Sequence, residues 1–351
     1  MFEHKDNTLI ISNGDDTADR RCLKQMLMEI MVKGASFVVP DIDGKLYVSL
    51  RDLLTRDGYK VKRLDMKDPQ KSSCYDPLKY ICSSSDVQKI ADTIIESTDP
   101  AESRHKDTFF EHSERMLLHA LLAYVADHAE TKNRTLSYLA DMAACTGSAE
   151  EESGHYDWTY FDQLFDQVKE KESYAFKCYQ NFRSDMSGPE RKKQLDGVKV
   201  SLVSRLNTLF DDRIRAVTSH DEMELDTLGN QKTAVFVSSS MGSVALLPAL
   251  LCTQALCMIC DNGPHPIPVH MIMDMRENKN PGYLPEFISH ICCSKDLFSF
   301  SVIIESVKDI ENNMYRGVTE EVLSACDNIC ILSGLTTVRF SGCRAVIDLI
   351  G

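Results

Sequence analysis

The residues from Thr8 to Val39 read TLIISNGDDTADRRCLKQMLMEIMVKGASFVV, and this stretch decides the class of fold. Two short apolar runs, 8–12 and 36–39, have the length and the composition of buried strands. Between them, apolar side chains recur at helical spacing: Leu23, Met26, Leu27, Ile30 and Met31. The pattern predicts a strand, a helix over 19–33 and a second strand, which is how a parallel sheet with crossover helices begins.

The same alternation continues to residue 84 and then stops. A helix is expected over 46–57 and a third strand over 60–64. From there to about residue 225 we expect only helices. Asp86 caps the first of them, which ends before Pro100, and the others run over 109–129, 136–145, 160–182 and 192–210. Strands return at 233–237, 269–273, 300–304 and 329–332. The prediction is an α/β domain over 1–84 and 226–351, interrupted by an all-α domain over 85–225.

Composition excludes some classes of function. Among the 351 residues, 39 Lys and Arg face 53 Asp and Glu, so the formal charge of −14 argues against a surface that binds nucleic acid throughout. The 13 cysteines and the absence of a secretion signal at the start predict reduced thiols in a cytoplasmic protein. The apolar run 244–260 is short for a membrane span and contains Pro248, so it is interpreted as a buried helix.

The loop after the first strand lacks the residues of a phosphate-binding loop. Such a loop requires G-x-x-x-x-G-K-[ST], because glycines let the backbone wrap the phosphates and the lysine neutralises them. The stretch Ser12–Arg20 reads SNGDDTADR, with one glycine, no Gly-Lys pair and three aspartates that would repel a triphosphate.

Several blocks carry a further signal through their order along the chain: NTLII at 7–11, SFVVPDIDGK at 36–45, DGYKV at 57–61, CYDPLKYI at 74–81, DTFFE at 107–111, GNQKTAVF at 229–236, PVHMIMD at 268–274 and CDNICILSG at 326–334. In this series the chain resembles the TraG/TraD-type coupling ATPases of conjugative type IV secretion. The resemblance implies a RecA-like P-loop NTPase-type sheet domain with an inserted all-α domain. We expect no counterpart here of the membrane-spanning N-terminus that is typical of that family.

The resemblance also implies that the hydrolytic residues are replaced. In active members an aspartate on the magnesium shell precedes a glutamate that activates water, whereas here Asp274 is followed by Met275, whose thioether cannot take a proton from water. Glu305 stands where a glutamine senses the γ-phosphate, and only Lys295 is basic where the family has arginines. Because phosphoryl transfer depends on positioning and electrostatic stabilisation, these losses together should remove most of the rate.

We therefore expect a catalytically degenerate coupling protein homologue, a pseudo-ATPase without intact Walker motifs, without a cofactor and without a catalytic residue. Its partners would be proteins of a conjugation or type IV secretion apparatus, an intact paralogue or further copies of itself. The nucleotide site would be vestigial and comprise Asn13, Gly14, Asp15, Asp16, Thr17, Ala18, Asp19, Asp274, Met275 and Glu305.

Two alternatives stay open. One is a functioning ATP-dependent DNA-translocation coupling protein that binds ATP and magnesium through a non-standard phosphate loop. The other is a nucleic-acid-binding adaptor that holds single-stranded DNA on a basic patch of the helical domain, formed by Arg191, Lys192, Lys193, Lys199 and Arg205. The plainer interpretation of that patch, which we favour, is a solvated helix face paired with neighbouring acids.

Two other groups of polar residues could suggest ion binding. Asp41, Asp43 and Asp274 follow strands and could meet at one edge of the sheet, but solvated strand-end residues are the favoured interpretation. Cys257 and Cys260, followed by His265 and His270, look superficially like zinc ligands, although their spacing is not that of a zinc knuckle. No metal site is predicted.

Overall fold

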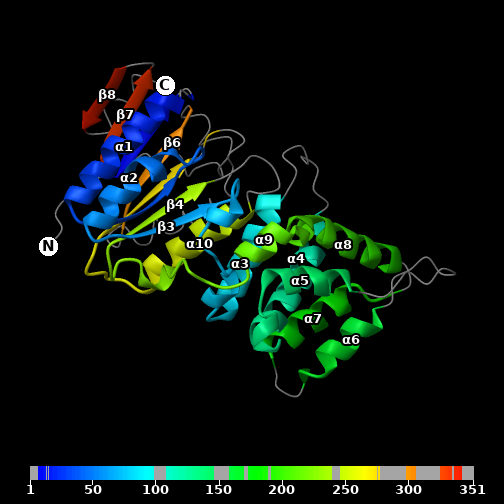
Figure 1. Cartoon of the computed structure of the whole chain (residues 1–351). Helices are drawn as coiled ribbons and strands as arrows, with labels where there is room; N and C mark the ends of the chain where they lie inside the picture. Colours follow the sequence, from blue (N-terminus) through cyan, green and yellow to red (C-terminus); the bar gives the residue numbers. More distant parts are fainter. Residues whose placement is uncertain are drawn as a thin grey trace. The chain divides into compact units, whose positions relative to one another are not determined.

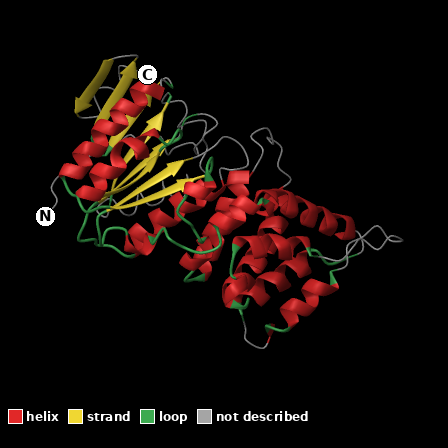
Figure 2. Cartoon of the chain, viewed as in Figure 1, coloured by secondary structure: helices red, strands yellow, loops and turns green. Residues whose placement is uncertain are grey.

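The structure is a computed structural model that describes residues 7–12, 14, 16–98, 108–145, 158–169, 173–188, 191–238, 246–274, 276, 298–305, 325–333 and 336–341. The chain divides into two compact units. The sheet unit comprises Met1–Ser73 and Met223–Gly351, and the helical unit comprises Cys74–Glu222. The strands all lie in the first unit, and the second is built from helices (Figures 1 and 2).

The sheet unit alternates strands and helices along the chain. Its first segment contains β1 (Thr8–Ser12), α1 (Asp16–Val32), β2 (Ser36–Pro40), α2 (Lys45–Arg56) and β3 (Lys60–Asp65). Its second segment contains β4 (Thr233–Ser238), α10 (Leu246–Asp261), β5 (Val269–Asp274), β6 (Ser299–Ile304), β7 (Asn328–Ser333) and β8 (Thr336–Ser341). The order across the sheet is β3-β4-β2-β5-β6-β1-β7-β8.

Every pair of neighbouring strands is parallel except β7 and β8, which are antiparallel. The predicted α/β class with a parallel sheet is thus confirmed, and so are the positions of the predicted strands. The edge strand β8 was not predicted, because its sequence TTVRFS has no continuous apolar run. The order places β6 between β1 and β5, two strands that lie more than 250 positions apart in the sequence.

Apolar packing explains why these segments form these elements. Helices α1 and α2 bury their apolar stripes in one cluster with side chains from β1, β2 and β4, among them Leu27, Leu50 and Phe236. Strands β4 and β5 are buried at every position, as expected for parallel strands that are covered on both faces. Helix α10 is buried on all sides, which fits its uniformly apolar sequence. Within the described residues, no helix combines the length and the apolar character needed to cross a membrane.

The helical unit is organised around its longest described helix. Its helices are α3 (Ser84–Thr98), α4 (Thr108–Asp127), α5 (Leu136–Ala144), α6 (Thr159–Asp166), α7 (Tyr174–Asp185), α8 (Lys192–Arg205) and α9 (Asp212–Val217). Helix α4 packs against α3, α5, α7 and α8 and buries an almost unbroken apolar face. The rings of Phe165 and Tyr179 stack with their centroids 4.1 Å apart, so α6 and α7 pack against each other.

Two helix predictions need correction. The helix predicted over 160–182 is two helices, because Ser173 starts α7 as its N-cap, its hydroxyl accepting a hydrogen bond from the Phe176 amide at 3.1 Å. Asp86 is not an N-cap: it lies in the first turn of α3, where its carboxylate accepts hydrogen bonds from the amides of Ser83 and Cys82. Ser83 accepts in return from the Asp86 amide, which completes a capping box.

Candidate functional site

Three neighbouring strands of the sheet unit bring polar residues to the edge where a ligand would bind. Ile10 of β1 and Asp274 of β5 both pair with Ile303 of β6, so the three parallel strands end at the same edge. Ser12 ends β1, Asp274 ends β5 and Glu305 follows β6. In open α/β sheets the carboxyl ends of the strands form the usual ligand crevice. The structure therefore places three positions of the predicted nucleotide site, or their direct neighbours, side by side.

At this edge an arginine, Arg276, lies between two aspartates, Asp274 and Asp19. The Arg276 guanidinium donates to Asp274 twice, from Nε to Oδ1 at 2.9 Å and from Nη2 to Oδ2 at 2.6 Å. Its Nη1 donates to Oδ2 of Asp19, in the first turns of α1. The exposed fractions are 4% for Arg276, 6% for Asp19 and 7% for Asp274, so this carboxylate–arginine–carboxylate triad is buried.

The loop after β1 is tied to the same triad. The Ser12 hydroxyl donates to Oδ1 of Asp19, and the Gly14 amide donates to the Ser12 oxygen at 3.3 Å. Gly14 has a φ of +86°, a left-handed conformation that glycine adopts without steric cost. The chain of hydrogen bonds thus runs from the loop through Ser12 and Asp19 to Arg276, and the part of the loop that the structure describes is held by the protein's own side chains.

Electrostatics keep Arg276 charged. Burial alone would lower the pKa of Arg276, but the hydrogen bonds and the negative charges of Asp274 and Asp19 outweigh it and hold that pKa above its ordinary value. Counted by formal charge, one guanidinium between two carboxylates leaves −1. Such a group repels phosphate, and both oxygens of Asp274 are already engaged.

The remaining predicted nucleotide-site residues are placed as follows. Asn13, Asp15 and Met275 lie outside the described residues, as does Lys295, and of Asp16 only the backbone at the start of α1 is described. Thr17 and Ala18 lie in the first turn of α1, and Glu305 is exposed after β6. The sequence prediction missed Arg276, although a lone arginine two residues beyond the aspartate of a buried strand is a signal that could have drawn attention to it.

The three strand-end aspartates have separate partners. Asp41 accepts hydrogen bonds from the amides of Leu46 and Tyr47, at 3.0 and 2.8 Å, and so holds the first turn of α2. Burial raises the pKa of Asp41, and these two bonds only partly offset that rise. Asp43 pairs instead with Arg20 at 2.8 Å and stays partly exposed. The favoured interpretation as solvated residues therefore describes Asp43 but is wrong for Asp41 and Asp274, which are buried.

The predicted basic patch does not form one surface among the side chains that the structure describes. Arg205 points inward: its Nε donates to Glu114 at 2.8 Å and its Nη1 donates to the carbonyl of Ile95 at 3.0 Å. Lys199 is buried, and burial lowers its pKa to about 8. Arg191 donates to the carbonyl of Asp185, while the side chains of Lys192 and Lys193 lie outside the description. Lys199 and Arg205 are thus not members of the solvated face either.

The cysteines and histidines near α10 do not gather. His270 is buried in β5 and its Nε2 lies 2.8 Å from Ser301 Oγ on β6. His265 Nε2 lies 2.6 Å from the carbonyl of Ile259 instead. Cys257 is buried on α10, whereas Cys260 is only partly buried.

Comparison with known proteins identifies the family. A family profile described as "Type IV secretory system Conjugative DNA transfer" matches residues 26–331, which is most of the chain. None of the curated proteins matches the chain in sequence.

Several solved structures share the fold. The bacterial conjugative coupling protein TrwBdeltaN70, in its unbound monoclinic form, superposes with a TM-score of 0.65 at 12% identity, over 92% of this chain and 68% of that one. TrwB in complex with ADP and Mg²⁺ gives 0.62 at 11% identity, over 92% and 70%. VirB4 of Thermoanaerobacter pseudethanolicus gives 0.54 at 9% identity, over 98% and 79%. The resemblance seen in the sequence is confirmed: the chain belongs to the family of type IV secretory system conjugative DNA transfer proteins.

Proposed function

We propose that this protein is a catalytically degenerate conjugation coupling protein homologue, which acts as a protein-binding or assembly component without hydrolysing ATP. The observation that carries the proposal is the buried triad of Asp19, Arg276 and Asp274. It occupies the edge of the sheet where a nucleotide phosphate and its magnesium would have to bind.

Binding of magnesium and binding of a triphosphate would both be unfavourable at this edge. A magnesium ion binds to carboxylates that are free to coordinate it, but Asp274 gives both oxygens to Arg276. Freeing Asp274 would leave a buried guanidinium with one partner fewer, and breaking a buried ion pair costs several kcal/mol. A triphosphate would need positive charge from the loop after β1, where the sequence supplies aspartates.

In the same proposal, the sheet unit is a RecA-like nucleotide-hydrolase-type domain and the helical unit is the all-α domain inserted into it. TrwB, which shares this fold at low identity, has been seen with ADP and Mg²⁺, so the fold itself accommodates a nucleotide. The difference would lie in the side chains at the edge of the sheet. A member of this family that does not hydrolyse ATP would act through contacts with other proteins of the secretion apparatus.

Nucleotide binding gives the direct test. The full chain is heated with and without millimolar ATP and magnesium, and we expect no change in melting temperature, because a ligand that binds only the folded state would raise it. ATPase activity is measured beside the variant Asp274→Ala, so that a contaminating ATPase is recognised by its indifference to the substitution. A nucleotide-dependent rise in melting temperature, or an activity that Asp274→Ala abolishes, would instead establish the functioning translocation ATPase.

Assembly gives the second test. Two exposed apolar side chains of the sheet unit are candidates for contacts with another coupling protein: Val32, which ends α1, is 89% exposed, and Val48, in the first turn of α2, is 66% exposed. We expect the chain to co-sediment with a family ATPase that keeps its phosphate loop, and Val32→Lys with Val48→Lys to weaken this association. The exposed Val200→Lys in the helical unit is the matched control. Equal association of the parent chain, the double variant and the control would reject both contacts.

A further inference from the structure

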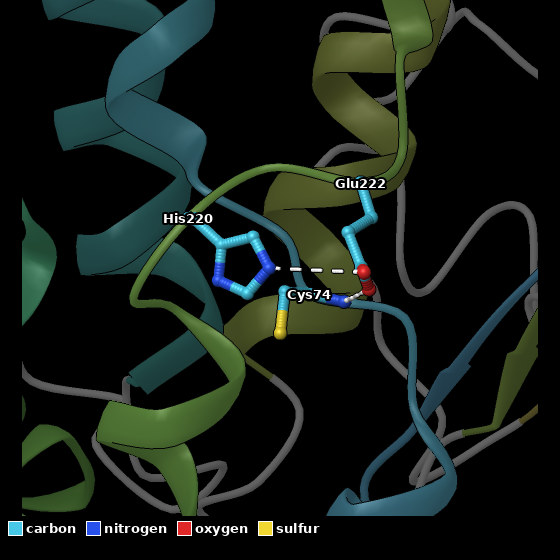
Figure 3. Close-up of side chains that lie close together, drawn as sticks. All are labelled: Cys74, His220 and Glu222. Atoms are coloured by element: carbon cyan, nitrogen blue, oxygen red, sulfur yellow. Dashed lines mark hydrogen bonds and ion pairs between the residues drawn. The ribbon is translucent and has the colours of Figure 1, made fainter.

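Three metal-ligating side chains gather where the helical unit begins and ends (Figure 3). Cys74 is the first residue of that unit and Glu222 is the last, and His220 lies two positions before the end. The sulfur of Cys74, a ring nitrogen of His220 and a carboxylate oxygen of Glu222 all lie within 4.8 Å of one another. Within the described residues, this is the one group of three or more such side chains close enough to hold a metal ion.

Main-chain hydrogen bonds hold the two segments side by side. The Glu222 amide donates to the Cys74 carbonyl at 2.8 Å, and the Cys74 amide donates to Oε2 of Glu222 at 2.8 Å. Next to them, the Tyr75 amide donates to the carbonyl of Val217 at 2.8 Å. These bonds fix the backbone on both sides of the group, and they place Oε1 of Glu222 toward the histidine (Figure 3).

The environment of His220 leaves one ring nitrogen available as a ligand. The Ser219 hydroxyl donates to the carbonyl of Ala216 at 2.8 Å, and its oxygen lies 3.0 Å from His220 Nδ1, from which it accepts in the tautomer that is protonated at Nδ1. Nδ1 then carries the proton of the neutral ring, and Nε2 has its lone pair directed at the carboxylate. A hydrogen bond of this kind to the non-ligating nitrogen is typical of metal-binding histidines.

The spacing between His220 and Glu222 suits an intervening ion. Nε2 lies 3.7 Å from Oε1, which is too long for a hydrogen bond. Two ligand atoms about 2.1 Å from a tetrahedral zinc ion stand about 3.4 Å apart. A thiolate, an imidazole and a carboxylate are all zinc ligands, and one thiolate with one carboxylate balances the charge of Zn²⁺.

The neighbouring acid does not compete for the ion. Asp221 is engaged by other side chains: the Tyr80 hydroxyl donates to it at 2.7 Å and Lys79 Nζ lies 3.0 Å away. The side chains of His220 and Glu222 are 60% and 51% exposed, so an ion can enter from solvent.

We propose that Cys74, His220 and Glu222 form a zinc site that joins the two ends of the helical unit and keeps a fourth coordination position open. That position takes a water molecule, or a ligand atom from a bound protein. The site does not depend on the proposed function, because none of its residues contributes to the edge of the sheet.

Cobalt and zinc are the probes for this site. The full reduced chain is titrated with Co²⁺, for which we expect a thiolate-to-cobalt absorption band that saturates at one equivalent and disappears when Zn²⁺ is added. Cys74→Ser should abolish the band. Ser219→Ala should keep the band but weaken zinc binding by about 10-fold to 100-fold, measured against a chromogenic chelator, because the histidine loses its orienting partner.

Matched controls guard against binding elsewhere in a cysteine-rich chain. Cys82→Ser removes an exposed thiol of the helical unit and should leave the titration unchanged. His220→Gln and Glu222→Gln should each lower zinc affinity at least 10-fold, while circular dichroism shows the helical content of the parent. The proposal is overturned if Cys74→Ser binds zinc as tightly as the parent chain, or if cobalt produces no thiolate band.

Discussion

The Arg276 guanidinium binds the Asp274 carboxylate edge to edge, with Nε–Oδ1 and Nη2–Oδ2 distances of 2.9 and 2.6 Å. Two parallel hydrogen bonds of this kind fix direction as well as distance, which is why arginine rather than lysine suits the position. Because the third nitrogen reaches Asp19, one side chain joins the end of β5 to the beginning of α1.

Removing this arginine should destabilise the sheet unit strongly. Arg276→Ala leaves two buried carboxylates without their cation, and we expect a loss of about 3–5 kcal/mol in the free energy of unfolding, measured by urea denaturation. The exposed pair of Arg213 and Asp211 offers the control, since Arg213→Ala should leave the midpoint nearly unchanged.

A neutral replacement of the whole triad sharpens the test. The triple variant Asp19→Asn, Arg276→Met, Asp274→Asn removes every charge together, and it should recover part of the stability lost in Arg276→Ala. If the triple variant is less stable than the single one, the cost does not come from unpaired buried charge and our explanation is wrong.

Acid should weaken the sheet unit through His270. Burial, helped by the charge of Lys33, lowers the pKa of His270 to about 3 from its ordinary value of 6.5. The unfolded chain takes up a proton near pH 6.5 and the folded chain does not, so this stability is present above pH 6.5 and is lost as the pH falls toward 3. One such group contributes up to about 1.4 kcal/mol per pH unit.

The variant His270→Gln isolates this effect. Its unfolding free energy should depend less on pH between 6.5 and 4 than that of the parent chain, while His112→Gln, at an exposed histidine, should keep the parental slope. Identical slopes for the parent and His270→Gln would show that the buried ring takes up its proton without unfolding.

Arg205 should stabilise the helical unit and should not bind DNA. Its partner Glu114 is buried, so Arg205→Gln leaves an unpaired carboxylate in the helical unit, and we expect a loss of about 3–5 kcal/mol. Arg191→Gln, which removes a more exposed cation, is the comparison. Salt-dependent binding of single-stranded DNA that Arg205→Gln abolishes without loss of stability would revive the basic patch as a nucleic-acid site.

Gly229 should not tolerate a side chain. It has a φ of +81°, and an added Cβ would lie 2.7 Å from the Cβ of His265 and closer still to its ring. Gly58 has nearly the same φ, +82°, with open space around it. Both Gly→Ala variants carry the backbone strain of about 1–2 kcal/mol, and thermal melting should show a clearly larger loss for Gly229→Ala.

Local patterns explain what could be predicted from the sequence. The apolar spacing from Leu23 to Met31 and the short runs at β1 and β2 are properties of neighbouring residues, so they identified the α/β class without knowledge of the packing. The same patterns could not show the break before Ser173, because α6 and α7 carry apolar side chains in compatible phase.

Contacts between distant residues explain what was missed. Arg276 and Asp19 lie 257 positions apart, and no spacing rule connects them. Cys74 and Glu222 lie 148 positions apart, whereas Cys257 and Cys260 attracted attention only because they are close in sequence. The strand order that brings β1 beside β6, and β6 beside β5, decides which acids meet at the edge.

The reciprocal hydrogen bonds between Cys74 and Glu222 also bear on how this protein can be rearranged. A segment whose two ends touch can be excised and the gap closed with a short turn, or exchanged for a segment of another length, while the strands on either side keep their connections. The helical unit can therefore be exchanged as a whole, and its length and sequence can differ between relatives while the sheet stays the same.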